Sequence, residues 1–379
     1  MDTIYFDNAA TTKICDEALD ELIECEREYY ANASSLHLSG QKAAAVTENA
    51  RDTIASLIGA EPDEIYFTSG ATEGNNILIK GAAAASCCEK PHVISSLTEH
   101  PAVINTCRNL AKKGLCEVTL LGVDENGRIY LDEFAGSFRE NTALVSLMFA
   151  NNEVGVINPV KDIAAIAHSN GALYHCDAVQ AVGKIPINVK EMGMDMLTSS
   201  AHKFYGPKGI GFMYIKRGIK IAPSVFGGEQ ERELRPGTIN TPAISAMATA
   251  LKTAYEHMET ETRRIKTLRD MLCQRIAQKI PEAHVNAAEG DRVAGILNVS
   301  FPGVAADKML YTLDSMGLRV SAGSACSSGS LEISPVIRSM AAESYGAPIR
   351  FSLGRFNTED EVLRAADIVE KAYRHLIEN

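Results

Sequence analysis

Between residues 64 and 215, short apolar runs alternate with amphipathic helical patterns. Apolar runs bounded by turn residues are typical of strands buried in a parallel sheet, whereas a 3.6-residue period is typical of helices. The alternation predicts an α/β fold in which helices cover a mostly parallel sheet. After a first strand near residue 65, we expect strands at 92–97, 117–123, 142–149, 172–176, 194–199 and 211–215.

Polar side chains follow five of these expected strands. In chain order they are Ser69 with Thr72, His100, Asn152, Asp177 with Gln180, and His202 with Lys203. In open α/β sheets, ligands bind in the crevice beyond the carboxyl ends of the strands. The sequence therefore predicts a ligand site at that edge of the sheet.

Two of these residues suit pyridoxal phosphate. Lys203 precedes a turn rich in Gly and Pro, and Asp177 ends an apolar run upstream. This cofactor needs a lysine amine for covalent attachment and a carboxylate beside its ring nitrogen. The alternative is a solvated surface lysine beside an ordinary turn, because short motifs are common. Similarly, 69–72 is either an anion site at a helix N-terminus or an ordinary N-cap.

The second half of the chain has a different organisation. Residues 216–240 are rich in loops, and a long helix over 244–276 is expected to link two domains. From residue 295 the pattern indicates a smaller α+β domain. We predict a large domain over 15–255 and a small domain formed by 1–14 and 256–379. The small domain carries a mobile loop at about 321–332.

Two residues of the small domain are candidates for chemistry. Cys326 lies in a segment of Gly, Ser and Ala, which suggests an accessible thiol; the alternative is an incidental cysteine in a loop. Arg350 suits a bidentate contact with a carboxylate, although an ordinary ion pair is the other interpretation.

Composition excludes several classes of protein. The net charge of -11 without a basic cluster argues against direct nucleic-acid binding. An acidic N-terminus without an apolar region predicts no signal peptide, and no apolar run is long enough to span a membrane. The nine cysteines contain no C-x-x-C pair, so we expect no metal site and a reducing, cytoplasmic location.

The chain as a whole resembles the cysteine desulfurases of the NifS/IscS type, in the class V aminotransferase superfamily. The shared motifs are Y-F-D-N-A-A-T-T, F-T-S-G-A-T-E, T-E-H-P-A-V, N-N-E-V-G, H-C-D-A-V-Q, S-A-H-K-F-Y-G-P-K-G, R-P-G-T, S-A-G-S-A-C-S-S-G-S-L-E and R-F-S-L-G-R. The resemblance implies the pyridoxal-phosphate-dependent transferase fold, fold type I. It also implies removal of sulfur from L-cysteine, which gives L-alanine and a persulfide.

The resemblance assigns roles around the cofactor. Lys203 holds pyridoxal 5'-phosphate covalently and moves protons at the substrate α-carbon. Asp177 pairs with the ring nitrogen, His100 stacks on the ring and takes part in acid–base transfer, and Gln180 contacts the ring hydroxyl. The phosphate is held by Ala71, Thr72, Ser200 and His202.

It also assigns the substrate and partner contacts. Asn152 and Arg350 hold the substrate carboxylate, and Cys326 takes the sulfur. Thr238 reaches the phosphate of the neighbouring subunit, which implies a homodimer. The persulfide then passes to a sulfur-acceptor protein, such as an iron–sulfur scaffold or a relay for tRNA or cofactor thiolation. A selenocysteine lyase or another class V enzyme is the alternative, because selenocysteine would fit the same pocket.

Overall fold

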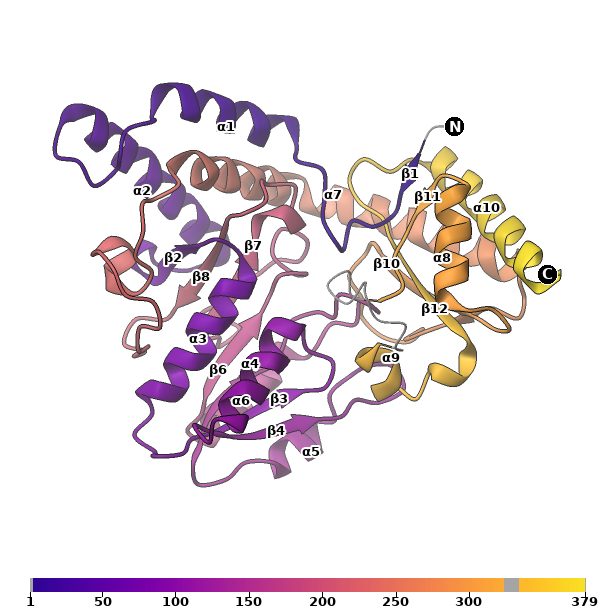
Figure 1. The fold of residues 1–379 in the computed structure, drawn as a ribbon, viewed down its shortest axis with the longest axis horizontal. Helices are drawn as coiled ribbons and strands as arrows, with labels where there is room; N and C mark the ends of the chain where they lie inside the picture. Colours follow the sequence, from indigo (N-terminus) through magenta and orange to yellow (C-terminus); the bar gives the residue numbers. More distant parts are fainter. Residues whose placement is uncertain (1–2, 324–333, 379) are drawn as a thin grey trace.

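The computed structural model describes residues 3–323 and 334–378, arranged in two lobes (Figure 1). The helices are α1 Asp16–Glu28, α2 Leu38–Ile58, α3 Ala71–Ala85, α4 Pro101–Lys112, α5 Leu131–Gly136, α6 Val160–Ser169, α7 Thr241–Lys279, α8 Ala306–Ser315, α9 Pro335–Ser339 and α10 Glu359–Glu378. The strands are β1 Ile4–Tyr5, β2 Ile65–Thr68, β3 His92–Ser96, β4 Glu117–Leu121, β5 Thr142–Ser146, β6 Leu173–Asp177, β7 Met196–Ser200, β8 Gly211–Ile215, β9 His284–Val285, β10 Ile296–Phe301, β11 Leu318–Arg319 and β12 Ala347–Ser352.

The larger lobe is built on a seven-stranded sheet in the order β2-β8-β7-β6-β5-β3-β4. Strand β8 runs antiparallel to both of its neighbours, and the remaining pairs are parallel. Because the direction reverses on each side of β8, β2 is parallel to β7. The carboxyl ends of β2, β7, β6, β5 and β3 therefore lie along one edge. The predicted α/β class, with a mostly parallel sheet between helices, is confirmed.

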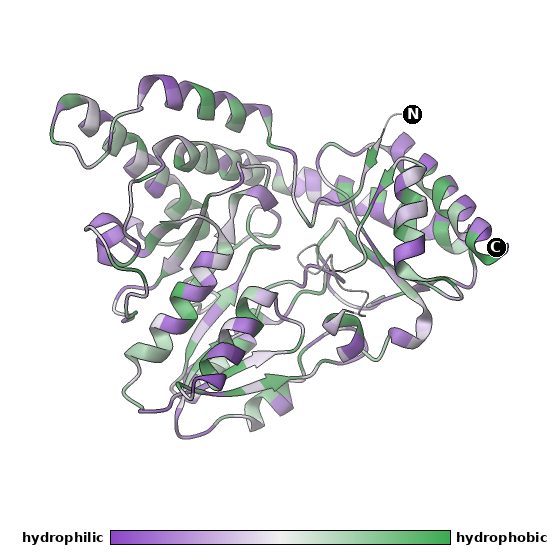
Figure 2. Cartoon of the chain, viewed as in Figure 1, coloured by the Kyte–Doolittle hydropathy of each residue, from purple (hydrophilic) through white to green (hydrophobic). Residues whose placement is uncertain are grey.

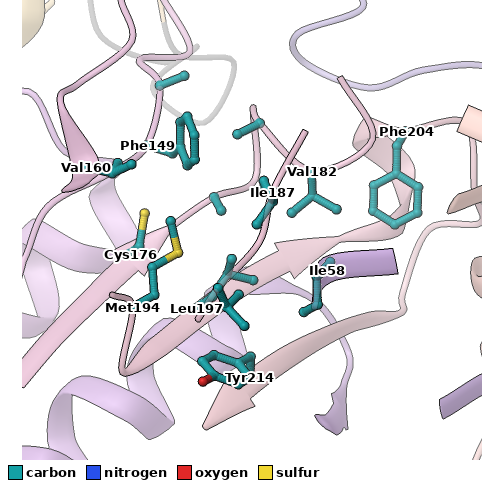
Figure 3. Packing of buried hydrophobic residues seen from close by; sticks show 14 of the residues in the cluster. Ile58, Phe149, Val160, Cys176, Val182, Ile187, Met194, Leu197, Phe204 and Tyr214 are labelled. Atoms are coloured by element: carbon teal, nitrogen blue, oxygen red, sulfur yellow. The ribbon is translucent and has the colours of Figure 1, made fainter. Parts of the chain in front are cut away.

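Strands β3, β7 and β8 are buried along their whole length because helices pack on both faces of the sheet (Figure 1), whereas the edge strand β4 is half-buried. Figure 3 shows part of the core on one face, where Leu197, Tyr214 and Ile58 lie together. Each is no more than 1% exposed, and burial of such a side chain contributes about 1.5–3 kcal/mol. In Figure 2 the helices carry hydrophilic residues on their outer sides, as the amphipathic pattern predicts.

The smaller lobe combines a three-stranded sheet, β12-β10-β9, with the pair β1-β11. Its core includes Phe6 from the N-terminal segment, Val299 from β10 and Phe351 from β12. The long helix α7 contributes to both lobes, since its first half packs in the larger core and its second half in the smaller one. The predicted boundary near residue 255 falls inside α7, and the division of the chain into 15–255 and 1–14 with 256–379 stays a prediction.

Several elements differ from the sequence-based expectation. The sequence pattern predicts a helix over 42–57, but α2 begins already at Leu38, because the His37 Nδ1 accepts a hydrogen bond from the Gly40 N–H and caps the first turn. Helix α5 was not predicted, since its six residues are too few for a helical period. Strand β5 ends at Ser146, before the apolar run itself ends. None of the described helices is both long and apolar enough to cross a membrane.

Candidate active site

A cavity of about 380 Å³ opens at the carboxyl-end edge of the large sheet. Its walls come from the N-terminal segment, the start of α3, the segments that follow β3, β5, β6 and β7, and strand β12 of the smaller lobe. The lining residues include the following predicted site residues: Ala71, Thr72, His100, Asn152, Asp177, Gln180, Ser200, His202, Lys203 and Arg350. The topology thus brings together positions that lie up to 279 residues apart, from Ala71 to Arg350.

Two predicted site residues are not among those lining the cavity. Thr238 is exposed on the loop that precedes α7. Cys326, with most of the predicted mobile loop, lies outside the described residues.

The turn before α3 forms one end of the cavity. Gly70 occupies the N-cap with a φ of 150°, a backbone conformation that L side chains rarely adopt, and no side chain caps the helix. The first N–H groups of an α-helix have no partner inside the helix, and its dipole favours an anion there. Together with the nearby Ser200 hydroxyl, this end of the cavity is suited to a phosphate group.

The Asp177 carboxylate lies at the end of β6 and is 6% exposed. Its Oδ2 accepts a 2.7 Å hydrogen bond from the Asn75 Nδ2, and its Oδ1 accepts a 3.2 Å bond from the Val179 N–H. A buried carboxylate with N–H donors on both oxygens provides a fixed negative charge at the cavity wall. Sequence reasoning did not identify Asn75.

Both polar atoms of the Gln180 side-chain amide form hydrogen bonds. Its Nε2 donates to the Ala9 carbonyl oxygen at 3.0 Å, and its Oε1 accepts from the Lys184 Nζ at 2.8 Å. Lys184 is half-buried and lies near two other cations, and desolvation together with the charges of Lys203 and Arg350 lowers its pKa to about 7. Because the amide oxygen faces Lys184, the amide nitrogen is the group presented toward Ala9 and the cavity.

Lys203 ends a short 3-10 helix, Ala201–Lys203, that directly follows β7. Phe204, fully buried in the core and visible near Val182 in Figure 3, anchors this turn. The Lys203 Nζ donates to the carbonyl oxygens of Ala9 and Ala10, both at 2.7 Å. The lysine amine is thereby directed into the cavity by the N-terminal segment.

His202 and His100 are both held in a neutral state. Burial and three nearby lysines lower the pKa of His202 to about 4, and its Nδ1 lies 3.1 Å from the Thr11 hydroxyl. Burial also lowers the pKa of His100, an effect that Asp177 partly opposes. The His100 Nδ1 accepts the Ala102 N–H at 3.1 Å, so the proton of the neutral ring is on Nε2.

Arg350 lies at the opposite wall and is 1% exposed. Its Nη1 donates to the Asn152 carbonyl oxygen at 2.9 Å, and its Nη2 forms a 2.8 Å ion pair with Asp7. Its Nε has no hydrogen-bond partner among the described residues. The guanidinium is therefore positioned rigidly while it keeps N–H donors for a further anion.

The N-terminal segment also contributes to the site, and the sequence did not identify it as a site element. Ala9, Ala10 and Thr11 line the cavity, and Asp7 fixes Arg350. The only signal was the motif Y-F-D-N-A-A-T-T, which reads equally well as a strand followed by a polar turn. Ala9 and Ala10 act through their backbone carbonyl groups, which every residue type has, so the sequence does not distinguish them.

The donor set of the cavity suits pyridoxal phosphate. A helix N-terminus with Ser200 and His202 lies at one end, a buried carboxylate at a wall, and a lysine amine between them. These are the groups required by a phosphate, a protonated ring nitrogen and an aldehyde, respectively. The residues present fit the cofactor that the sequence predicted.

Known proteins resemble the chain over nearly its whole length. Residues 4–364 match the family Aminotransferase class-V. A cysteine desulfurase of Trichormus azollae is 41% identical over 99% of this chain and 94% of the relative. A cysteine desulfurase IscS of Dictyoglomus turgidum is 41% identical over 98% of this chain and 95% of the relative. A solved structure named NifS-like protein superposes with a TM-score of 0.92 at 36% identity, covering 99% of this chain and all of that chain.

Proposed function

The chain belongs to the class-V aminotransferase family and is a pyridoxal-phosphate-dependent cysteine desulfurase, and from this premise we propose a role for each group around its cavity. The observation that carries the proposal is the convergence of Lys203, Asp177 and Arg350 on one cavity that ends in a helix N-terminus. Lys203 supplies an amine, Asp177 a fixed carboxylate and Arg350 a fixed guanidinium.

The first set of groups holds the cofactor. Lys203 would attach it, Asp177 would pair with its ring nitrogen and the Gln180 amide nitrogen would donate to its ring hydroxyl. Ala71, Thr72, Ser200 and His202, which line the cavity, would hold the phosphate. When bound, the cofactor supplies a conjugated ring that accepts the electron pair released at the substrate α-carbon.

The second set holds L-cysteine. The buried Arg350 guanidinium pairs with the substrate carboxylate, while Asp7 and the Asn152 carbonyl prevent it from rotating. The Asn152 side chain, on the cavity wall, contacts the same carboxylate. Fixing the carboxylate places the α-carbon near Lys203, which moves the proton at that atom.

Sulfur leaves the substrate through a thiol on this chain. The thiolate of Cys326, which lies outside the described residues, attacks the sulfur of the bound cysteine. The carbon–sulfur bond breaks, a sulfur–sulfur bond forms on Cys326, and the three-carbon product gains a proton at its β-carbon and leaves as L-alanine. The persulfide is then passed, in the cytoplasm, to an acceptor protein such as an iron–sulfur scaffold or a thiolation relay.

The reaction is tested by measuring both products together. With L-cysteine and a thiol reductant, we expect alanine and sulfide in a one-to-one ratio. L-selenocysteine and other L-amino acids serve as competing substrates. A rate with L-selenocysteine far above that with L-cysteine would favour the lyase alternative, and alanine without sulfide would contradict sulfur removal.

His100 is proposed to take part in acid–base transfer at the substrate in its neutral form, with its Nε2–H as hydrogen-bond donor. Because burial lowers its pKa, the ring is neutral at pH 7 and becomes charged only as the pH falls below the ordinary value of about 6.5. Protonation at Nδ1 would also break the hydrogen bond to Ala102. Activity should thus fall on the acid side of pH 6.5. His100→Gln should lower kcat by about 10²- to 10⁴-fold.

The control for His100→Gln is His257→Gln, an exposed position on α7. The pH profile of kcat/KM is measured for both variants. An unchanged acid limb in the His100 variant would contradict the proton-transfer role, even if its rate were reduced.

A homodimer is proposed, with Thr238 at the phosphate of the partner. Exposed apolar side chains support an interface: Leu36 is 92% exposed and Phe226 is 84% exposed. The segments that carry them are neighbours, since residues 33–34 of one and residues 230–232 and 239 of the other line a common cavity. We expect sedimentation at twice the chain mass of 40.9 kDa. Combined Leu36→Asp and Phe226→Asp substitution should give a monomer that binds the cofactor more weakly.

The matched control is Tyr311→Asp, which changes an exposed aromatic residue on α8 of the smaller lobe. That variant should remain a dimer. An active monomer of the unmodified chain with full cofactor affinity would remove the role given to Thr238.

A further inference from the structure

Asn75 lies inside helix α3, one turn beyond the phosphate-facing end of that helix. It is fully buried and is not among the residues that line the cavity. Its Nδ2 donates to the Asp177 Oδ2 at 2.7 Å, and its Oδ1 accepts from the Thr198 hydroxyl at 2.6 Å. Asn75 therefore connects a helix to two neighbouring strands.

The direction of each hydrogen bond in this chain follows from the chemistry of its atoms. An amide oxygen only accepts, so the Thr198 hydroxyl must donate its hydrogen to the Asn75 Oδ1. The Asn75 amide nitrogen is then the group that faces Asp177, where it donates to the carboxylate. With the Asn75 amide reversed, its oxygen would lie against the Asp177 carboxylate oxygen, where neither atom can donate, so the Asp177 end fixes the orientation of the amide.

The sheet places the two end members side by side. Asp177 and Thr198 are register partners on the parallel strands β6 and β7, so their side chains point to the same face of the sheet. Helix α3 covers that face closely: a Cβ atom at Gly74 would lie only 2.9 Å from the Thr198 Cγ2. The absence of a side chain at Gly74 lets the helix approach near enough for Asn75 to reach both partners.

We propose that Asn75, itself oriented by Thr198, is a positioning residue that aims the Asp177 carboxylate at the ring nitrogen of the cofactor. The inference rests on the proposed role of Asp177. The same helix carries Ala71 and Thr72 at its N-terminus. Asn75 consequently sets the distance between the phosphate end of the cavity and the carboxylate, since it fixes α3 against β6 and β7.

The test compares two cofactors that differ at the ring nitrogen alone. The full-length apoprotein is titrated by equilibrium dialysis with pyridoxal phosphate and with its 1-deaza analogue, in which a C–H group replaces the nitrogen. The wild type should bind pyridoxal phosphate about tenfold to hundredfold more tightly, the value of a hydrogen bond to a charged group. The measured quantity is the ratio of the two dissociation constants, that of the 1-deaza analogue over that of pyridoxal phosphate. In Asn75→Leu and in Thr198→Val this ratio should fall about tenfold, toward one.

Two comparisons separate positioning from general damage. Thr198→Ser keeps the hydroxyl and should keep the wild-type ratio, and Asn109→Leu, an exposed asparagine on α4, should also keep it. Inorganic phosphate should compete equally well in all variants, because the helix N-terminus remains. Thr198→Val is close to isosteric, so it tests the inference even if Asn75→Leu does not fold.

The outcomes distinguish the inference from its premise. If Asn75→Leu and Thr198→Val prefer pyridoxal phosphate over its 1-deaza analogue as strongly as the wild type does, Asn75 is not a positioning residue. If the wild type itself binds both cofactors equally, the role of Asp177 fails and the inference fails with it. The inference is supported if Thr198→Val binds the two cofactors with similar affinity while Thr198→Ser keeps the wild-type preference for pyridoxal phosphate.

Discussion

Lys203→Ala is expected to abolish covalent cofactor attachment and to lower kcat/KM for L-cysteine by about 10⁴-fold or more, since both nucleophilic and proton-transfer roles are lost. The Lys203 amine is the group that the Ala9 and Ala10 carbonyls direct into the cavity. Non-covalent contacts with Asp177 and the helix N-terminus remain, so the variant should still bind pyridoxal phosphate reversibly. Borohydride reduction followed by mass spectrometry measures the attachment.

The control for this variant is Lys252→Ala, an exposed lysine on α7. It should retain both the covalent adduct and the activity. A reduced cofactor adduct on any residue of the Lys203→Ala protein, with near-normal turnover, would show that another amine is responsible. The candidates are Lys208, which also lines the cavity, and Lys184, whose amine has a pKa of about 7.

Cys326→Ser is expected to reduce the formation of alanine and sulfide to the background of a sample without protein. A hydroxyl cannot replace the thiolate, because serine ionises far above neutral pH and is a poor nucleophile toward sulfur. Cofactor binding and L-cysteine binding should be unchanged, since neither needs the thiol. In the wild type, mass spectrometry after a single turnover should find one added sulfur atom on the peptide that contains Cys326.

The matched control is Cys87→Ser, which changes an exposed cysteine that follows α3. Both products should form at the wild-type rate in this variant. Normal sulfide release by Cys326→Ser, or an added sulfur atom found on a peptide with another cysteine, would assign the sulfur-accepting step elsewhere.

Much of the larger lobe could be predicted from local patterns. Strands β3, β6, β7 and β8 fall within one or two residues of the expected runs, because an apolar run bounded by turn residues indicates a buried strand without any knowledge of its neighbours. Helix α5 and the early start of α2 were missed. A six-residue helix has no measurable period, and a histidine N-cap is not a strong start signal.

The residues of the candidate site also fall into two groups, those that local sequence predicts and those that it does not. Lys203, Asp177 and His100 are reactive residue types at strand ends, so the sequence alone could select them. Asn75 and Lys184 could not be selected, because an asparagine or lysine within a helix or turn has no distinctive local pattern. Their importance comes from Asp177 and Gln180, which they contact in the folded chain.

The sequence by itself determined the class of fold and the residues that carry the chemistry, because periodicity and residue type are properties of neighbouring positions. Only the tertiary structure decided that the Ala9 carbonyl meets Lys203, that Asp7 fixes Arg350 and that β8 reverses direction within a parallel sheet. These contacts join positions 194 and 343 residues apart. Such long-range contacts follow from the packing of the two lobes as wholes, which no local stretch of sequence encodes.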